Sequence, residues 1–250
     1  MLHYIENRVA IVTGGSRGYG FSTAKFLLEM GAKIVVTGRN RVRLTEAYHE
    51  LSAESGGGEN LLTHSLEATI GEEWDSLLAA TLERFGRIDI LVNNHGAGIK
   101  ITETENMTDD DFRNILDVNL TSVMMGCRRV IPIMKRQGSG TILNVSSGCA
   151  TKSWGCWAIY TAAKAGLVGF SKCLHKEMEA WGGRAMCFLP GAGQTDFCNA
   201  ANIPGFDLTG FPIADDVART IVFCLDQPDS CVLESVSQWG TKQIAGMTPW

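Results

Sequence analysis

The chain has 250 residues, of which 45% are hydrophobic and 20% charged, so it can bury a large core and is not mainly disordered. Its 22 basic and 27 acidic residues give a net charge of −5. This balance argues against a protein built mainly to bind nucleic acid or an anionic membrane.

Short β-branched runs alternate with longer helical patterns along the chain. We predict strands at residues 8–14, 33–38, 60–64, 88–94, 140–147 and 184–190. Helical patterns occupy residues 18–30, 41–54, 72–85, 109–136, 158–180 and 214–226. Apolar strands that alternate with helices predict a parallel sheet covered on both faces. We therefore expect an α/β fold over residues 1–250, a single doubly wound parallel sheet (Rossmann fold) with helices on both faces.

Residues 192–212 have no clear period and contain Gly193, Pro204, Gly205, Gly210 and Pro212. Irregular segments of this length inside a compact domain are commonly functional. We predict that this segment forms a lid over a substrate.

The eight cysteines raise the question of disulfides or a metal site. Most of them lie in apolar segments, and the chain is large enough to fold without covalent links. No CxxC or paired Cys/His spacing is present, so we expect no metal. The sequence has no apolar run of about 18 residues and no secretory signal pattern. We therefore expect reduced thiols in a cytoplasmic protein that binds no membrane.

A glycine-rich segment, TGGSRGYG at residues 13–20, joins the first strand to the first helix. Gly14, Gly18 and Gly20 let the backbone turn tightly and approach a pyrophosphate, and the helix N-terminus favours the negative charge. A tight turn with no ligand is the plainer interpretation. The position at the first strand–helix turn of an alternating chain favours a dinucleotide site.

The charges at the end of the second strand bear on the choice of cofactor. An acid there usually binds the ribose of NAD, but this strand ends with Gly38 and Arg39. Arg39, with Arg17 beside it, would suit a 2′-phosphate through bidentate donation. We predict NADP(H), with NAD(H) as the alternative; both arginines are otherwise ordinary surface residues.

Tyr160 and Lys164 are four residues apart in a helical segment and therefore share a face. An ammonium group beside a phenol lowers the phenol pKa toward neutrality. Ser147 ends the preceding strand, at the edge where ligands bind to such sheets. A Tyr–Lys pair alone is more commonly just a helix surface, and the glycine loop and the strand-end serine favour an active site.

The motifs TGGSRGYG, NNHG (93–96), Asn119 in DVNL, NVSS, YTAAK and PG (190–191) stand in one order over residues 6 to about 226. In this order the sequence resembles the short-chain dehydrogenases/reductases. The resemblance implies that Tyr160 is the general acid/base and that Lys164 lowers its pKa and binds the nicotinamide ribose. It implies that Ser147 holds the substrate oxygen and that Asn119 supports a water relay to the lysine.

The resemblance also implies a set of cofactor-binding residues. Asn93 matches the first asparagine of the family's NNAG motif, and Thr195 matches the threonine that contacts the nicotinamide carboxamide. The full set is Gly14, Ser16, Arg17, Gly18, Gly20, Arg39, Asn93, Tyr160, Lys164, Pro190, Gly191 and Thr195.

Several positions depart from the family pattern. His95 stands where the family has a small alanine, and we expect a packed ring without a catalytic role. Ser65 stands where an acid commonly contacts the adenine. The tail after residue 226 lacks the family's frequent glycine-rich ending.

These observations lead us to expect an NADP(H)-dependent oxidoreductase that interconverts a secondary alcohol and a ketone. Trp154, Trp157 and the aromatic residues of the lid favour an apolar ring-bearing substrate such as a hydroxysteroid. The alternatives are a 3-oxoacyl thioester reductase and a non-catalytic NADP(H)-binding redox sensor. A basic cluster at residues 128, 129, 135 and 136 would attract an acidic carrier, or is simply a solvated helix end. The long helices near 109–136 and 158–180 predict a homodimer or homotetramer.

Overall fold

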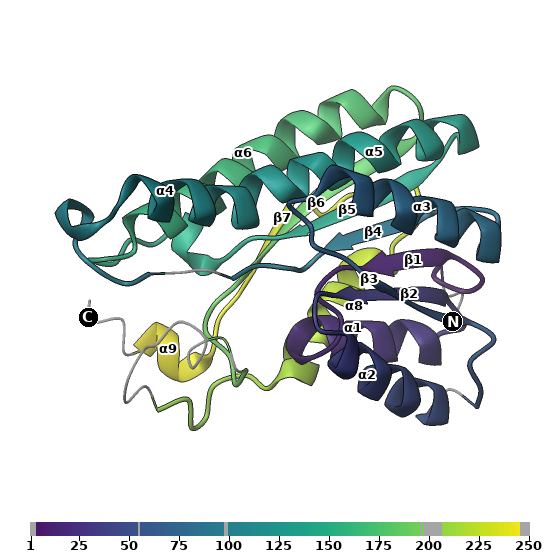
Figure 1. Ribbon diagram of the computed structural model, residues 1–250, viewed down its shortest axis with the longest axis horizontal. Coiled ribbons are helices and arrows are strands. Elements are labelled where there is room, and N and C mark those ends of the chain that lie inside the picture. Colours follow the sequence, from purple (N-terminus) through teal and green to yellow (C-terminus); the bar gives the residue numbers. More distant parts are fainter. Residues whose placement is uncertain (1–3, 55, 98–99, 196, 198–206, 246–250) are drawn as a thin grey trace.

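The computed structural model describes residues 4–54, 56–97, 100–195, 197 and 207–245 (Figure 1). Seven strands form one parallel sheet in the order β3-β2-β1-β4-β5-β6-β7. The strands are β1 Val9–Val12, β2 Lys33–Gly38, β3 Leu61–Ser65, β4 Ile90–Asn93, β5 Gly140–Val145, β6 Gly183–Pro190 and β7 Ser235–Gln238. The sheet confirms the predicted doubly wound α/β fold.

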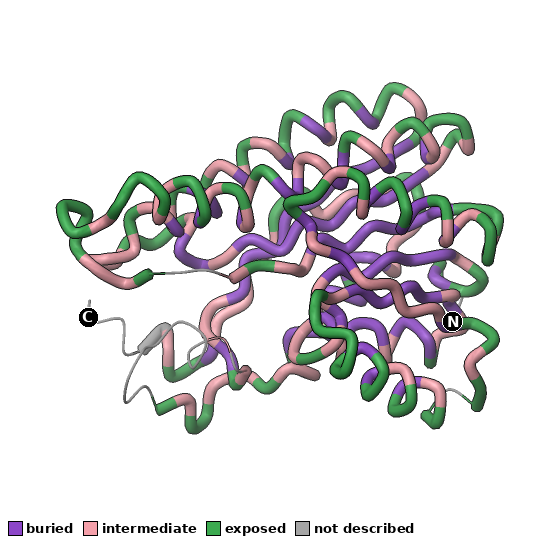
Figure 2. The backbone as a smooth tube through the Cα atoms, viewed as in Figure 1, coloured by how far each residue is buried: buried purple, intermediate pink, exposed green. Residues whose placement is uncertain are grey.

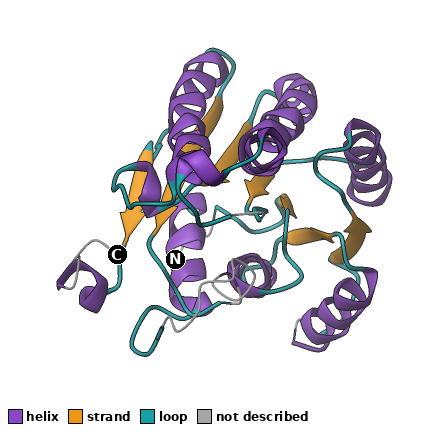
Figure 3. Cartoon of the chain, turned by 60° about the vertical axis from the view of Figure 1, so that its left-hand side comes forward, coloured by secondary structure: helices purple, strands orange, loops and turns teal. Residues whose placement is uncertain are grey.

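Helices cover both faces of the sheet, as Figure 3 shows with the strands between two groups of helices. The helices are α1 Gly18–Glu29, α2 Arg41–Glu54, α3 Gly71–Phe85, α4 Asp109–Leu116, α5 Ser122–Gln137, α6 Ala158–Glu179, α8 Ala214–Leu225 and α9 Thr241–Ala245. One core cluster packs α1, α2 and α8 against the sheet, and a second packs α3, α5 and α6 against the other face. The central strands are buried along their length, and the outer sides of the helices are exposed (Figure 2).

The helix predicted at 109–136 is interrupted by a π-helical turn, Asp117–Thr121, between α4 and α5. Such turns insert one residue into a helix and are frequent at functional sites. Asn119 lies in this turn and is fully buried. The strand β7 was not predicted, because its sequence SVSQ is short and has one apolar residue, Val236, which packs against the core at the sheet edge.

From β1 the chain adds strands toward one edge of the sheet as far as β3 and then toward the other edge from β4 onward. The parallel neighbours β1 and β4 therefore lie side by side although they are far apart in the chain. In open parallel sheets, this reversal leaves a crevice at the carboxyl ends of the two strands, where ligands bind. The fold therefore points to the segments after β1 and β4 as one side of a ligand site.

The cysteines of the described residues are free thiols: Cys127, Cys149, Cys156, Cys173, Cys187, Cys224 and Cys231. Cys198 lies outside the described residues. Within the described part of the chain, the helices are too short or too polar to span a bilayer.

Candidate active site

A cavity of about 880 Å³ opens at the carboxyl ends of the strands. It is lined by the loop after β1, the ends of β2 and β3, the segment after β4, the loop after β5, the start of α6 and the segment after β6. Among the predicted site residues, the lining includes Gly14, Ser16, Arg17, Gly18, Arg39, Ser147, Tyr160, Lys164, Pro190, Gly191 and Thr195. The fold thus brings together residues that are as far apart in the chain as Gly14 and Thr195.

The glycine loop adopts the backbone that the sequence requires. Gly14 and Gly18 have φ values of +63° and +57°, in the left-handed region that favours glycine. Gly20 lies in the first turn of α1 and does not line the cavity. A Cβ at Gly20 would lie 2.5 Å from the Gly14 carbonyl oxygen, so this glycine allows close packing of the helix on the loop.

The polar groups of the catalytic candidates meet at the wall formed by α6 and the loop after β5. Tyr160 and Lys164 are 7% and 3% exposed, and Lys164 Nζ lies 5.8 Å from the centre of the Tyr160 ring. Lys164 Nζ donates to the Val145 carbonyl oxygen at 3.0 Å. Ser147 follows β5 and hydrogen-bonds Tyr160, whereas Ser146 donates to the Lys164 carbonyl oxygen at 2.8 Å. The geometry therefore favours Ser147 over Ser146 as the serine of the site.

Burial sets the ionisation of this pair. It raises the pKa of Tyr160 well above its usual value, and the Ser147 hydrogen bond only partly opposes that rise. Burial also lowers the pKa of Lys164 to about 8. Desolvation of the phenolate is the largest effect on the Tyr160 pKa, whereas the effect that we expect from Lys164 stays a prediction. The phenol is protonated at neutral pH and therefore has a proton to give, and a positive charge beside it makes the transfer easier.

Asn119 is behind the cavity wall. Its Nδ2 donates to the Ala97 and Ile115 carbonyl oxygens at 2.8 and 2.9 Å. Its Oδ1 is buried and accepts no hydrogen bond from the described residues. This oxygen lies near Lys164, because a Cβ at Gly96 would be 3.0 Å from it and 3.5 Å from Lys164 Nζ. An unpaired acceptor beside a buried ammonium is compatible with the expected relay.

Asn93 does not reach the cavity, which corrects our expectation. It is fully buried, and its Nδ2 donates to Asn144 Oδ1 at 2.9 Å, which links β4 to β5. Asn144 in turn donates to Ser171 on α6 at 2.9 Å. The neighbouring Asn94 lines the cavity instead, and its Nδ2 donates to the Gly14 carbonyl oxygen at 3.1 Å. Side chains alternate along a strand, so Asn93 lies on the same face as Leu91, which is the face covered by α3, α5 and α6.

The end of the cavity beyond β2, where we expect the 2′-phosphate of NADP(H), is lined by positive charges. Arg17, Arg39 and Arg43 line it, and Arg39 forms an ion pair with Glu67 at 3.5 Å. Leu66 also lines this end, next to Ser65 at the end of β3.

Aromatic rings line the other end. Trp154, Trp157, Tyr160 and Phe197 line the cavity, and neighbouring ring centres lie about 6 Å apart: 6.3 Å for Trp154–Trp157, 5.8 Å for Trp157–Tyr160 and 5.9 Å for Tyr160–Phe197. Of the predicted lid, Ala192, Gly193, Gln194 and Thr195 line the cavity beside Phe197. Phe211 is described but is not in the lining, whereas Ile203 and Phe206 lie outside the described residues.

The segment after β7 adds a wall that sequence reasoning missed. Trp239 packs on Trp154 with ring centres 6.4 Å apart, and a Cβ at Gly148 or Gly191 would collide with its ring. Gln243 lines the cavity, and its buried Oε1 accepts no hydrogen bond from the described residues. No motif signals these contacts, because they depend on β7 joining the sheet.

Comparisons with known proteins agree with this geometry. The family model described as short chain dehydrogenase matches residues 8–203. The chain is 36% identical over 228 residues to a 3-oxoacyl-[acyl-carrier-protein] reductase of Synechocystis, covering 88% of this chain and 90% of that one. It is 31% identical to a 3-oxoacyl-[acyl-carrier-protein] reductase of Chlamydia muridarum, covering 93% and 95% of the two chains.

Solved structures are similar throughout the fold. The 3-ketoacyl-(acyl-carrier-protein) reductase of Brucella melitensis, complexed with NADH, superposes with a TM-score of 0.83 at 29% identity, over 93% of this chain and 97% of that one. An alcohol dehydrogenase of Thermococcus sibiricus, complexed with 5-hydroxy-NADP, gives a TM-score of 0.84 at 26% identity, over 95% and 98%. The chain therefore belongs to the short-chain dehydrogenase family of oxidoreductases.

Proposed function

We propose that the protein is an NADP(H)-dependent reductase that interconverts a ketone and a secondary alcohol, with a 3-oxoacyl thioester as the leading substrate class. One observation carries the reaction type: Tyr160, Lys164 and Ser147 meet in a cavity that also contains the glycine loop. A buried proton donor next to a dinucleotide cradle is the combination that carbonyl reduction needs.

The residues present fit a nicotinamide dinucleotide. Gly14 and Gly18 form a cradle with left-handed backbone at the N-terminus of α1, which suits a pyrophosphate. Lys164 and Thr195 would hold the nicotinamide end. When bound, the cofactor supplies the hydride for the carbonyl carbon.

The chain's own residues supply the proton and the charge stabilisation. Tyr160 Oη, kept protonated by burial, donates a proton to the substrate oxygen as charge develops there. The Ser147 hydroxyl donates a hydrogen bond to the same oxygen. The Lys164 ammonium stabilises the phenolate left on Tyr160, and Asn119 orders the polar groups behind it.

Arg39, Arg17 and Arg43 support the preference for NADP(H). Three guanidinium groups line the end of the cavity beyond β2, and Glu67 is the one acid among the described lining residues. Planar guanidinium groups bind phosphate through paired hydrogen bonds. The preference is tested by comparing kcat/KM for NADPH and NADH.

The relatives named as 3-oxoacyl-carrier reductases support the thioester substrate and give no support to the hydroxysteroid that we expected. The basic cluster at residues 128, 129, 135 and 136 gives no separate support to this substrate class. Arg129 pairs with Asp75 at 2.9 Å, and Lys135 and Arg136 are exposed in the last turn of α5. Arg136 is 14 residues, or about 21 Å of helix, beyond the cavity-lining Ser122.

An apolar ring ketone is the second candidate, and the row formed by Trp154, Trp157, Tyr160 and Phe197 favours it. Flat aromatic walls stack well on a ring-bearing substrate. Apart from Lys164, this end of the cavity has no charged side chain among the described residues.

The test is NADPH oxidation with acetoacetyl-coenzyme A, a ring ketone panel and small cyclic ketones. We expect turnover of the thioester, and we expect the Tyr160→Phe variant to fold, bind NADPH and lose at least about 100-fold in kcat. Turnover of ring ketones alone would select the second candidate. NADPH binding without turnover of any carbonyl compound would support the redox-sensor alternative and refute the enzymatic proposal.

We also propose that the protein forms a homodimer or homotetramer through the long helices α5 and α6. Light scattering at micromolar concentration is the test, and a monomeric mass would refute it.

A further inference from the structure

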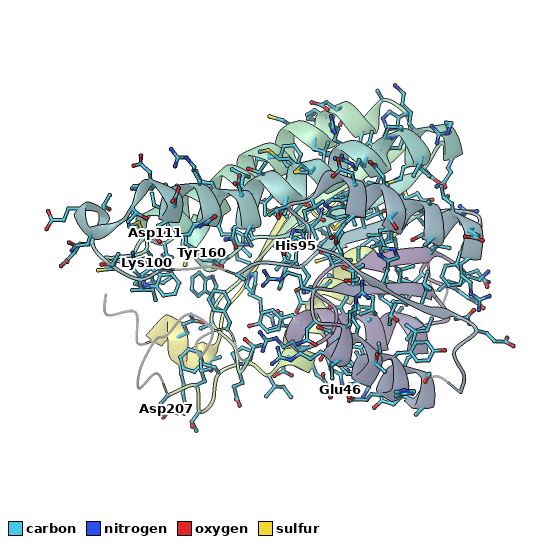
Figure 4. The ribbon with its side chains drawn as sticks, in the orientation of Figure 1. Glu46, His95, Lys100, Asp111, Tyr160 and Asp207 are labelled. Carbon is cyan, nitrogen blue, oxygen red and sulfur yellow. The ribbon has the colours of Figure 1, made fainter. Side chains whose placement is uncertain are left out.

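His95 occupies a bridging position that the proposed mechanism does not use. It follows β4 and lines the cavity, with its ring between the end of β1 and the start of α5. Its Nδ1 lies 2.7 Å from Thr13 Oγ1 and its Nε2 lies 2.8 Å from Ser122 Oγ. The ring also contacts Trp74 edge-on, with centres 6.2 Å apart. Figure 4 shows His95 and Tyr160 on the same side of the helix layer that contains α4, α5 and α6.

Hydrogen-bond partners hold the ring at both of its nitrogens. Thr13 Oγ1 accepts from the backbone N–H groups of Asn94 at 3.0 Å and of His95 at 3.3 Å, and it lies 3.1 Å from the Val92 carbonyl oxygen. Ser122 Oγ lies 2.8 Å from the Val118 carbonyl oxygen. In a neutral ring one nitrogen donates and the other accepts, so the ring makes one hydrogen bond of each kind to these two hydroxyls.

The electrostatics agree with a neutral ring. Burial, and then the nearby charges of Lys164 and Arg39, lower the pKa of His95 to about 3. The ring thus stays in one protonation state at neutral pH and serves as a fixed bridge with one donor and one acceptor.

The segment that His95 anchors contacts the glycine loop on one side. Asn94 Nδ2 donates to the Thr13 and Gly14 carbonyl oxygens, both at 3.1 Å. A Cβ at Gly14 would lie only 3.0 Å from the His95 Cα. A shift of this segment would therefore move the loop that is suited to the pyrophosphate.

The same segment contacts the catalytic group on its other side. The Ala97 carbonyl oxygen accepts from Asn119 Nδ2 at 2.8 Å. Gly96 lies against both Asn119 Oδ1 and Lys164 Nζ, since a Cβ there would be 3.0 and 3.5 Å from them. Residues 94–97 are thus a spacer between the cofactor cradle and the four catalytic candidates, which we call the tetrad: Asn119, Ser147, Tyr160 and Lys164.

We propose that His95 is a positioning residue for the proposed reduction: its neutral ring ties the 94–97 spacer to β1 through Thr13 and to α5 through Ser122. It thereby sets the separation between the glycine loop and the Asn119–Lys164 side of the tetrad. A dinucleotide must span these two parts, so this separation fixes where its reactive end lies relative to Tyr160. The inference rests on the proposed function for its catalytic consequence.

Variants at position 95 test the role. In His95→Ala we expect kcat to fall at least about 10-fold, because small misplacements of a reacting centre are costly. His95→Gln should recover most of this loss, since its side-chain amide offers a donor and an acceptor to Thr13 and Ser122, as the neutral ring does. The matched control is His49→Gln on the exposed side of α2, for which we expect wild-type kinetics.

Removing the Ser122 hydroxyl distinguishes a positioning role of His95 from a role in packing alone. Ser122→Ala should lower kcat in the same direction, and the double variant with His95→Ala should be no worse than His95→Ala alone. Calorimetric titration gives the NADPH dissociation constant of each variant, and thermal unfolding gives its folded fraction. A His95→Ala variant with wild-type kcat, KM and NADPH affinity overturns the proposal. Equal losses in the Ala and Gln variants also overturn it.

The tautomer has its own test. Nitrogen-15 NMR of histidine-labelled protein, with the His95→Gln variant for assignment, should show one ring proton, fixed on a single nitrogen, near neutral pH. A charged ring, or a ring that exchanges between its two tautomers, overturns the bridge. Wild-type protein that reduces no carbonyl compound refutes the proposed function, whereas NMR and NADPH affinity still decide whether the bridge exists and shapes the cradle.

Discussion

Arg39 and Glu67 form an ion pair, with NH1 and Oε2 3.5 Å apart, at the end of the cavity beyond β2 and β3. The guanidinium that would bind a 2′-phosphate is therefore already in contact with a carboxylate. A bound phosphate must compete with this carboxylate and is repelled by it. We therefore expect Glu67 to weaken the preference for NADP(H) that we propose for Arg39.

Neutralising this carboxylate should strengthen the preference. In Glu67→Gln we expect KM for NADPH to fall about 3-fold and KM for NADH to stay within error. Only NADPH carries the 2′-phosphate that the Glu67 carboxylate would repel. The measurement is steady-state kinetics with both cofactors at low and high salt. Glu46→Gln, an exposed residue of α2 labelled in Figure 4, is the control and should change neither value. Parallel changes for both cofactors would contradict the competition.

The pH dependence of reduction should follow Lys164. Its pKa is lowered to about 8, so the ammonium that supports Tyr160 is present below that pH and is lost above it. We expect kcat for reduction to fall as the pH rises through about 8. In Lys164→Arg the charge persists to high pH, so this fall should disappear even if the absolute rate drops. If kcat of the Lys164→Arg variant still fell above about pH 8, the titrating group would not be Lys164.

Gly96 should not tolerate a side chain. A Cβ at this position would lie 3.0 Å from Asn119 Oδ1, tighter than an ordinary contact, and 3.5 Å from Lys164 Nζ, so the amide would have to shift. We expect Gly96→Ala to fold and to lose about 10-fold in kcat. The control is Gly169→Ala on α6, which has open space around it and should retain activity while gaining up to about 1 kcal/mol of stability. Wild-type kcat in Gly96→Ala would show that the spacer has room to shift.

Stability should depend strongly on Arg184. This residue is 6% exposed and donates to the carbonyl oxygens of Leu225, Gln227, Pro228 and Cys231, at distances of 2.6 to 3.2 Å. Replacement with methionine leaves these buried acceptors unpaired at the C-terminus of α8.

We expect Arg184→Met to lower the free energy of unfolding by about 3 kcal/mol or more, measured by urea denaturation. The exposed Arg136→Met should change it by less than about 0.5 kcal/mol. Equal stabilities of the two variants would contradict a stabilising role of the Arg184 hydrogen bonds to these carbonyl oxygens.

The strands and most helices could be predicted because local patterns determine them. The sequence placed β2 and α2 at the bounds that the structure shows, since apolar runs and helical periods end at clear turn signals. The order of the glycine loop, Ser147, Tyr160 and Lys164 was also readable, and the cavity lining includes all of them.

The remaining features depend on contacts between distant segments. Which of two adjacent asparagines reaches the cavity depends on the strand register, and Asn93 faces the covered side. The net pKa direction at Tyr160 depends on how deeply the fold buries the phenol, which residue spacing does not encode. β7 and Gln243 have no strong pattern of their own and acquire their positions from β6 and the loops around it.

The packing of Trp239 against Gly148 and Gly191 has a consequence for biosynthesis. The ribosome makes this residue only after all seven strands and Asn119, Ser147, Tyr160 and Lys164. A nascent chain that stops before β7 contains the other six strands but lacks both Trp239 and Gln243. The side of the cavity that these two residues support is therefore completed only after β7 has been synthesised.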